Sequence, residues 1–337
     1  MTDATAPTAL DAPRAAPAER RDRVRVSRRI APYVMLAPYL IVMAIALVYP
    51  LYEAVILSFQ DWKLGTPLSS AEWVGWKNYR FLLDDPRMWS SAGVTLVFAA
   101  AVVTLEMAIG VALALLLDRK LPGMTIFRTI FILPMMVAPI VVGLIWRFMY
   151  DEQFGTLNKL LNAVGLDGLP WLSSPDWALP AIILADVWQW TPFVFILTLA
   201  ALQGLPRSVM EASRMDGATP LQTVFYIKLP LIVPVLVVTL LLRLIDAFKV
   251  LEVIFIMTDG GPAASTEVLA LHLYKTAFTS QQLGRASALA NLLLILVLVI
   301  GVALIIVSKV TEARARRAER EAAAEPDDVA LQAVQVT

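Results

Sequence analysis

Charged side chains recur inside one of the most apolar segments of this sequence. At every third position that segment carries Arg243, Asp246, Lys249 and Glu252. Residues three apart are neighbours on a helix, so the alternating signs can neutralise one another as a ladder. A charge inside a membrane helix is costly unless it faces protein or water. The pattern therefore predicts either a polar path for a solute or an ionic contact that holds helices together.

The preceding apolar segment carries a second group of polar and aromatic side chains. One face of a helix there would present Asp186, Gln189, Trp190 and Phe193. At about 1.5 Å of rise per residue, Trp190 and Arg243 fall at comparable depths, and Glu106 of an earlier segment also lies near mid-membrane and could pair with Arg243. A mixture of rings and polar groups is typical of a small-molecule site. We expect substrate contacts from Gln189, Trp190, Phe193, Arg243 and Asp246. The alternative is that these residues only pack helices together.

Several kinds of chemistry are disfavoured by what the sequence lacks. It has no cysteine and one histidine, so zinc sites of the Cys/His kind and Cys/His nucleophiles are nearly excluded, and we expect no metal. His272 is predicted to be an ordinary polar surface residue. Basic and acidic residues number 28 each, which argues against a nucleic-acid surface. No G-x-x-x-x-G-K-[ST] pattern occurs, so the chain is not expected to hydrolyse ATP or to act as an enzyme.

The composition is that of a membrane protein. Of the 337 residues, 58% are hydrophobic and 17% charged, and the mean hydropathy is +0.70. A helix needs about 20 apolar residues to cross a bilayer, and six segments qualify: 30–59, 92–117, 127–150, 177–203, 231–257 and 286–308. They predict an all-α polytopic membrane protein with six transmembrane helices over residues 30–308. Outside it lie a disordered tail over residues 1–29 and a C-terminal tail over 309–337.

Basic residues near the span ends indicate the orientation, because they favour the cytoplasmic side. Arginines crowd the N-terminal tail up to Arg29, and the C-terminal tail carries Lys309 and four arginines. Both termini are therefore predicted to be cytoplasmic, as is the loop over residues 204–230. The first apolar segment ends in no small-residue cleavage site, so we interpret it as a retained span and not as a signal peptide.

The loop over residues 204–230 carries charge between two apolar spans. Gly217 is placed to end a short helix by adopting a positive φ. Thr219 and Gln222 stand three apart, as in a capping box that starts a second helix, and Pro230 marks the entry into the next span. The sequence therefore predicts two short helices that meet at an elbow.

The charges of this loop bear on what it contacts. A helix that lies on a membrane surface usually carries Lys and Arg on its polar face. Glu211 and Asp216 disfavour contact with anionic lipid. A protein partner is therefore the better interpretation of the loop, and a lipid surface is the alternative.

The same loop carries a family resemblance. The run E-A-S-R-M-D-G-A over residues 211–218, followed by I-K-L-P over 227–230, resembles the EAA loop of permease subunits of ABC importers that work with a binding protein. The usual form has Ala where this chain has Ser213. The resemblance implies the type I importer fold and a coupling helix that docks into a cytoplasmic ATPase. The residues that would make this contact are Glu211, Ala212, Ser213, Asp216, Gly217 and Ala218.

Other stretches narrow the resemblance to carbohydrate importers, and in particular to the first permease subunit of maltose-type systems. They are L-A-P-Y-L over residues 36–40, W-Q-W-T-P-F over 188–193 and F-K-V-L-E-V-I-F-I-M-T-D-G-G-P over 248–262. The family usually has Phe-Asp where this chain has Leu251-Glu252. In such permeases the sugar is held mid-membrane by the helices that flank the coupling loop. Sugars suit such a site because they present C–H faces to rings and hydroxyls to polar groups.

The resemblance also implies a set of partners. These are a second homologous permease, two copies of an ABC ATPase that uses the ATP, and a periplasmic or lipid-anchored binding protein that delivers the sugar. The binding protein would be received by Gly260, Gly261 and Pro262. The location would be a bacterial inner membrane, and no cofactor would be held by the chain itself.

Three other functions remain as alternatives. An ABC importer with a different cargo, such as amino acids, phosphate or metal ions, is disfavoured by the aromatic fourth span and the sugar-family stretches. A secondary carrier coupled to protons through Glu106 and Asp246 has no need of a docking elbow and often shows inverted repeats, which we do not detect. An intramembrane enzyme would need a nucleophile with a base or a metal cluster, for which the residues are missing.

Overall fold

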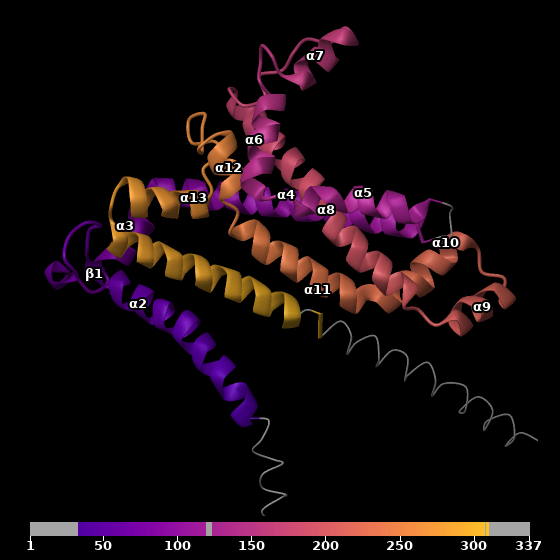
Figure 1. Ribbon diagram of the computed structural model, residues 1–337, viewed down its shortest axis with the longest axis horizontal. Helices are drawn as coiled ribbons and strands as arrows, with labels where there is room; N and C mark the ends of the chain where they lie inside the picture. Colours follow the sequence, from indigo (N-terminus) through magenta and orange to yellow (C-terminus); the bar gives the residue numbers. More distant parts are fainter. Residues whose placement is uncertain (1–32, 119–122, 307, 310–337) are drawn as a thin grey trace, which may run out of the picture. The chain divides into compact units, whose positions relative to one another are not determined.

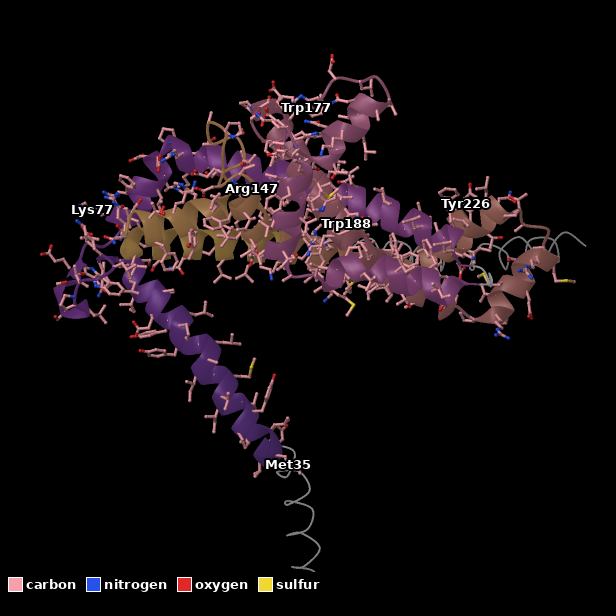
Figure 2. All side chains as sticks on the ribbon, turned by 45° about the horizontal axis from the view of Figure 1, so that its top comes forward. Met35, Lys77, Arg147, Trp177, Trp188 and Tyr226 are labelled. Atoms are coloured by element: carbon pink, nitrogen blue, oxygen red, sulfur yellow. The ribbon has the colours of Figure 1, made fainter. Side chains whose placement is uncertain are left out.

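A computed structural model describes residues 33–118, 123–306 and 308–309, and it divides into two compact units that meet between Ile56 and Leu57. In the described part of the first unit the chain is helical from Tyr33. This helix includes a π-helical stretch, η1 (Ala44–Val48), and continues as α2 (Tyr49–Ser58). Figure 2 shows its side chains standing out on all sides, and Met35 is 82% exposed. The predicted N-terminal tail lies outside the described residues.

The described residues of the second unit form helices joined by loops, together with one two-stranded antiparallel ribbon (Figure 1). Its longest helices are α4 (Pro86–Leu116), α8 (Pro175–Gln203), α11 (Leu229–Phe248) and a final helix over Leu283–Ile306. Shorter elements are β1 (Gln60–Asp61), η2 (Leu68–Ser70), β2 (Glu72–Trp73), α3 (Lys77–Asp84), α5 (Met124–Met136), α6 (Pro139–Met149), α7 (Thr156–Ala163), α9 (Arg207–Met215), α10 (Pro220–Gln222), η3 (Thr223–Lys228), α12 (Glu252–Met257), α13 (Leu269–Tyr274) and η4 (Lys275–Thr279).

The membrane-spanning character predicted from composition is confirmed by the lengths of these helices. In the part of the chain that the structure describes, five helices are long and apolar enough to cross a bilayer: Tyr33–Ser58, Pro86–Leu116, Pro175–Gln203, Pro220–Phe248 and Leu283–Ile306. A sixth crossing is possible if the bent pair α5 and α6 counts as one. The protein is therefore an all-α, polytopic membrane protein.

The third predicted span, residues 127–150, is not one continuous helix. Its two parts, Ile126–Met136 and Pro139–Met149, are bent by 95°. The physical cause is Pro139, which has no N–H to give and forces the residue before it into an extended conformation. Ala138 accordingly has ψ of 136°. The predicted span is therefore made of two helices joined at a bend.

The fifth predicted span, residues 231–257, differs from the structure at both ends. Helix α11 stops at Phe248, and α12 starts only after Leu251, whose φ and ψ of −135° and −56° are not helical. At its other end, α10 and the π-helical η3 run without a break into α11, so Pro220–Phe248 is one helix. Of the two short helices expected at the elbow, only α9 stands alone. Pro230 lies in the first turn of α11, as predicted, although the helix is continuous from Pro220.

The core of the second unit lies between α4, α8 and α11, which run alongside one another in Figure 1. Buried side chains such as Phe98, Val102 and Ile182 fill it. Gly110 permits the close approach of α4 to α8, because a Cβ added there would lie 2.7 Å from the Cβ of Val194. This packing brings the charged residues of three helices to one place.

Candidate functional site

Arg243 of α11 lies at the centre of the packed helices and is only 2% exposed. Its Nε and Nη2 donate to the two carboxylate oxygens of Glu106, at 2.6 and 2.8 Å. Nη2 also donates to Asp186 at 3.0 Å, and Nη1 donates to Asp246 at 2.7 Å. The predicted pairing of Arg243 with Glu106 is confirmed, and two further carboxylates share the guanidinium.

These contacts connect three helices through one side chain, because Glu106 is on α4 and Asp186 is on α8. A planar guanidinium suits a carboxylate with two acceptor oxygens, because its N–H groups donate in a fixed fork. Buried charges of this kind are tolerated only when they are paired. Each of the three guanidinium nitrogens of Arg243 therefore donates to a carboxylate of the protein.

A pocket of about 280 Å³ opens beside this cluster. It is lined by Pro139, Asp186, Trp190, Asp246, Ala247, Lys249, Val250, Glu252 and Val253. The ring of Trp190 faces the guanidinium of Arg243, whose Cζ lies 4.9 Å from the ring centroid, a cation–π arrangement. Among the predicted substrate contacts, Trp190 and Asp246 therefore line the pocket, and Arg243 lies directly behind it.

The pocket exists because two helices break at the same place. The chain leaves α11 after Phe248 and restarts at Glu252, opposite the point where α6 begins at Pro139. Within this break Lys249 pairs with the second oxygen of Asp246 at 3.2 Å. The expected continuous ladder is thus interrupted, because Glu252 belongs to α12. Sequence reasoning missed Pro139 as a lining residue, although a proline inside an apolar span is the signal that could have pointed to it.

The remaining predicted substrate contacts, Gln189 and Phe193, do not line this pocket. Gln189 is fully buried, and its Nε2 donates to the carbonyl of Val137 at 3.1 Å, where α5 breaks. Its Oε1 has no hydrogen-bond partner among the described residues. Phe193 packs edge-on against Trp190 at 6.4 Å between ring centroids. A separate apolar hollow of about 400 Å³ is lined by Ile130, Phe131, Leu133, Pro134, Val137, Trp188 and Pro192.

The elbow, residues 207–222, has the local structure that its sequence predicts. Gly217 adopts φ of +76°, and its N–H donates to the carbonyl of Arg214 while the N–H of Ala218 donates to that of Ser213. This is a Schellman end to α9. Thr219 and Gln222 then form the reciprocal capping box that starts the next helix. The turn is therefore fixed by hydrogen bonds within a few residues.

Most of the predicted contact residues of the elbow are open to the surroundings. Glu211, Ala212, Asp216 and Gly217 are exposed, Ala218 is half-buried, and Ser213 is buried with its hydroxyl donating to the carbonyl of Met210. Large apolar side chains are exposed beside them: Met215, Leu221, Phe225 and Tyr226, the last labelled in Figure 2. Large exposed apolar side chains gathered in one short segment are typical of an interaction site.

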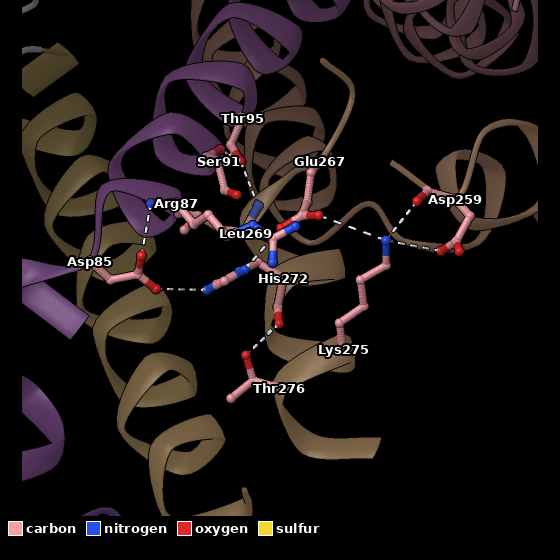
Figure 3. A network of polar contacts seen from close by, with 10 residues as sticks. All are labelled: Asp85, Arg87, Ser91, Thr95, Asp259, Glu267, Leu269, His272, Lys275 and Thr276. Carbon is pink, nitrogen blue, oxygen red and sulfur yellow. Dashed lines mark hydrogen bonds and ion pairs between the residues drawn. The ribbon is translucent and has the colours of Figure 1, made fainter. Parts of the chain in front are cut away.

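The Gly-Gly-Pro loop, residues 258–267, is held by a polar network (Figure 3). Asp259 and Gly260 adopt positive φ, and the Gly261–Pro262 peptide is cis. The Nζ of Lys275 donates to the carbonyl of Asp259 at 2.6 Å and lies 3.7 Å from a carboxylate oxygen of Glu267. Gly260, Gly261 and Pro262 thus sit in a tightly bonded loop.

His272 is part of this network and is 8% exposed, so its assignment as a surface residue was wrong. Its Nδ1 is hydrogen-bonded to Glu267 at 2.9 Å, and its Nε2 lies 4.0 Å from Asp85. The hydrogen bond with His272 holds the pKa of the Glu267 carboxyl below its usual range, against the opposing effect of burial. Burial of His272 follows from packing of α13 against α4, which no local signal encodes.

Comparison with protein families places the chain. Residues 106–317 match the family described as "Binding-protein-dependent transport system inner membrane component", and the protein belongs to this family. It is a permease subunit of the ABC importer class. Like those permeases, it is a multi-pass membrane protein.

Particular relatives cover most of the chain. A probable ABC transporter permease protein, y4oQ, of Sinorhizobium fredii is 36% identical over 85% of this chain and 91% of its own length. The trehalose/maltose transport system permease protein MalF of Thermococcus litoralis is 35% identical over 79% of this chain and 89% of its own length. The sulfoquinovosyl glycerol transport system permease protein SmoG of Agrobacterium fabrum is 34% identical, over 78% and 85%.

The fold has a counterpart among solved structures. A chain of a bacterial ABC transporter that imports alginate superposes with a TM-score of 0.75 at 24% identity, over 86% of this chain and 98% of that one. At that identity the likeness concerns the fold. The ABC importer permease fold predicted from the sequence is thereby confirmed.

Proposed function

We propose that this protein is the subunit through which an ABC importer moves a carbohydrate across the membrane. The observation that carries the proposal is the pocket between α8 and the break after α11, where the Trp190 ring stands among charged groups. Asp246, Lys249 and Glu252 supply acceptors and a donor for hydroxyls, and the ring supplies an apolar face. This combination suits a sugar, a polyol or a glycerol derivative better than it suits a metal ion or a purely apolar solute.

The relatives support the choice of cargo by their names. Trehalose and maltose, sulfoquinovosyl glycerol and sn-glycerol-3-phosphate are named for proteins that are 34–35% identical to this chain. All are carbohydrates or glycerol derivatives. We propose a solute of this group, delivered by a periplasmic or lipid-anchored binding protein that meets Gly260, Gly261 and Pro262. A related solved structure contains the alginate transporter with its periplasmic protein.

We further propose that the energy comes from separate subunits. The sequence has no phosphate-binding G-x-x-x-x-G-K-[ST] loop, so ATP would be hydrolysed on two copies of an ABC ATPase and the chain itself would hold no cofactor. The exposed apolar side chains of the elbow suit docking of that ATPase on Glu211, Ala212, Ser213, Asp216, Gly217 and Ala218. The elbow and both termini would then be cytoplasmic in a bacterial inner membrane. A second, homologous permease would complete the channel.

Reconstitution tests the proposal. The whole importer is purified, placed in liposomes with its binding protein, and assayed for ATP-dependent uptake of radiolabelled disaccharides, polyols and glycerol derivatives, with amino acids and phosphate as comparison solutes. We expect uptake of a carbohydrate that requires ATP. Uptake of an amino acid alone, or uptake driven by an ion gradient without ATP, would contradict it.

The pocket itself is tested by Trp190→Ala in the same assay. Loss of the ring contact should raise KM for the cargo by about tenfold, which corresponds to about 1.4 kcal/mol. Trp188→Ala is the matched control, because Trp188 lies on the same helix but lines the apolar hollow instead. Equal effects of the two variants would remove Trp190 from the solute site.

A further inference from the structure

Two ion pairs join helix α11 to α4, in addition to the apolar packing between the two helices. One tie is the buried pair of Arg243 and Glu106. The other joins Lys228, at the start of α11, to Asp118, just past the end of α4, with 2.6 Å between Nζ and Oδ2. The Lys228 and Asp118 side chains are 20% and 16% exposed, so the pair is largely shielded from water. About four turns of α11 and about three turns of α4 separate the two ties.

The position of Lys228 connects this second tie to the elbow. From Pro220 to Phe248 the chain is one helix, so Lys228 and the residues that follow the elbow turn share one rod. Lys228 is the last residue of η3, a π-helical stretch in that rod. A π-helical stretch is a local departure from the α-helix that is frequently found at functional sites. The ion pair between Lys228 and Asp118 therefore lies at the residue where the π-helical stretch ends.

Two ion pairs restrict the relative motion of two helices more than a single ion pair does. With Arg243–Glu106 as the only ion pair, apolar packing around Ala114 and Ile232 alone would oppose a change in the angle between α11 and α4 at the elbow end. A second ion pair several turns away adds a directional contact there, so that the two helices move together more closely. A displacement at the elbow then reaches Glu106, Arg243 and the pocket beside them.

We propose that the Lys228–Asp118 ion pair is a positioning contact that makes α4 and α11 one lever between the elbow and the solute pocket. The inference rests on the proposed function, because it assumes that an ATPase moves the elbow. Neither residue is among those that line the pocket. The contribution of the pair is the efficiency with which ATP hydrolysis is converted into uptake.

The experiment uses the whole importer in liposomes and measures uptake and binding-protein-stimulated ATP hydrolysis in the same samples. Lys228→Ala and Asp118→Ala should lower the number of solutes moved per ATP by about tenfold, within the usual range of coupling between sites. Hydrolysis itself should stay within about twofold of the original rate. Lys228→Arg and the charge exchange of Lys228→Asp with Asp118→Lys should restore the ratio. Lys159→Ala, an exposed change on α7, is the control.

A second arm covers variants that assemble poorly. The chain has no cysteine, so Asp118→Cys with Lys228→Cys introduces a single reactive pair. Linking that pair with a short bismaleimide should raise the uptake per ATP of the unlinked double variant severalfold. The tie is then covalent and no longer depends on charge.

The outcomes separate this inference from the proposed function. If the original importer shows no ATP-dependent carbohydrate uptake, the proposed function fails before any variant is compared. If it shows such uptake but both alanine variants keep the original ratio, the lever is overturned. The lever is also overturned if uptake and hydrolysis fall in proportion to the amount of assembled complex and cross-linking restores neither.

Discussion

Arg243 and Trp190 stand 4.9 Å apart, yet their roles differ at the scale of single residues. The arginine is enclosed, and carboxylates of α4, α8 and α11 accept its N–H groups. The tryptophan lines an open pocket and offers a ring face. Truncation of the first therefore leaves buried charges without a partner, whereas truncation of the second removes a contact from the pocket.

Arg243→Ala should destabilise the folded subunit by about 3–5 kcal/mol, because Glu106 and Asp186 would remain buried without their counter-charge. Arg243→Lys should recover only part of this loss, since an ammonium cannot reproduce the paired contact with Glu106. Thermal unfolding of the purified complex in mild detergent measures the effect. Unfolding temperatures that match the original protein in both variants would show that the cluster does not stabilise the fold.

The elbow shows how a short element is defined by its ends. The Schellman turn at Gly217 and the capping box at Thr219 set the angle between α9 and the long helix that follows. No atom lies within 4 Å of a Cβ built at Gly217, so the glycine is required for its positive φ and not for space. The angle at which the elbow presents its exposed side chains therefore depends on this one backbone conformation.

Gly217→Val should disturb the turn, because a β-branched residue strongly disfavours positive φ, whereas Gly217→Asn should be tolerated. We expect the valine variant to retain its place in the membrane and lose most ATP-driven uptake, with the asparagine variant close to the original. Uptake assays normalised to the amount of subunit in the membrane compare them. Full uptake by the valine variant would show that coupling does not depend on the angle of the elbow.

The network of the Gly-Gly-Pro loop gives a prediction about pH. Because the folded-state pKa of Glu267 is lowered, its contribution to stability is complete at neutral pH and is lost as pH falls through the folded pKa. Glu267→Gln should therefore be less stable than the original at pH 7, and the difference should shrink below about pH 4. Thermal unfolding of the original and the variant, at pH 7 and again below about pH 4, measures the difference in stability. A difference that stays constant with pH would assign the loss to packing.

At the scale of the whole molecule, much apolar surface of the described chain has no protein against it. The helix Tyr33–Ser58 has no buried residue in its most apolar part, and only 11% of the most apolar part of Leu283–Ile306 is buried. Exposed apolar side chains also lie in and just after the elbow, at Met215, Leu221, Phe225 and Tyr226. Lipid and partner subunits are the natural covers for such surfaces.

Gentle purification from native membranes should therefore yield this chain together with a second permease and a P-loop ATPase in stoichiometric amounts. Glu211→Lys reverses a charge on the exposed face of α9 and should weaken retention of the ATPase while the second permease stays bound. Mass spectrometry of the two samples measures the partners. Recovery of the chain alone would contradict the proposed assembly.

The sequence by itself determined the features that depend on a few neighbouring residues. Hydropathy predicted the spans, and Gly217, Thr219 and Gln222 predicted the elbow turn, because a cap is formed by atoms of residues at most a few positions apart. Charge and depth also predicted the pairing of Arg243 with Glu106. The break at Pro139 had a local signal as well, which hydropathy alone did not register.

Only the tertiary structure decided which of these features meet. Arg243 and Glu106 are 137 residues apart, and Asp186 shares the same guanidinium only because three helices pack around it. Gln189 faces the α5–α6 break instead of the pocket, and His272 is buried, for the same reason. Side-chain direction is set by the rotation of each helix against its neighbours, and that rotation is fixed by packing over the whole contact surface.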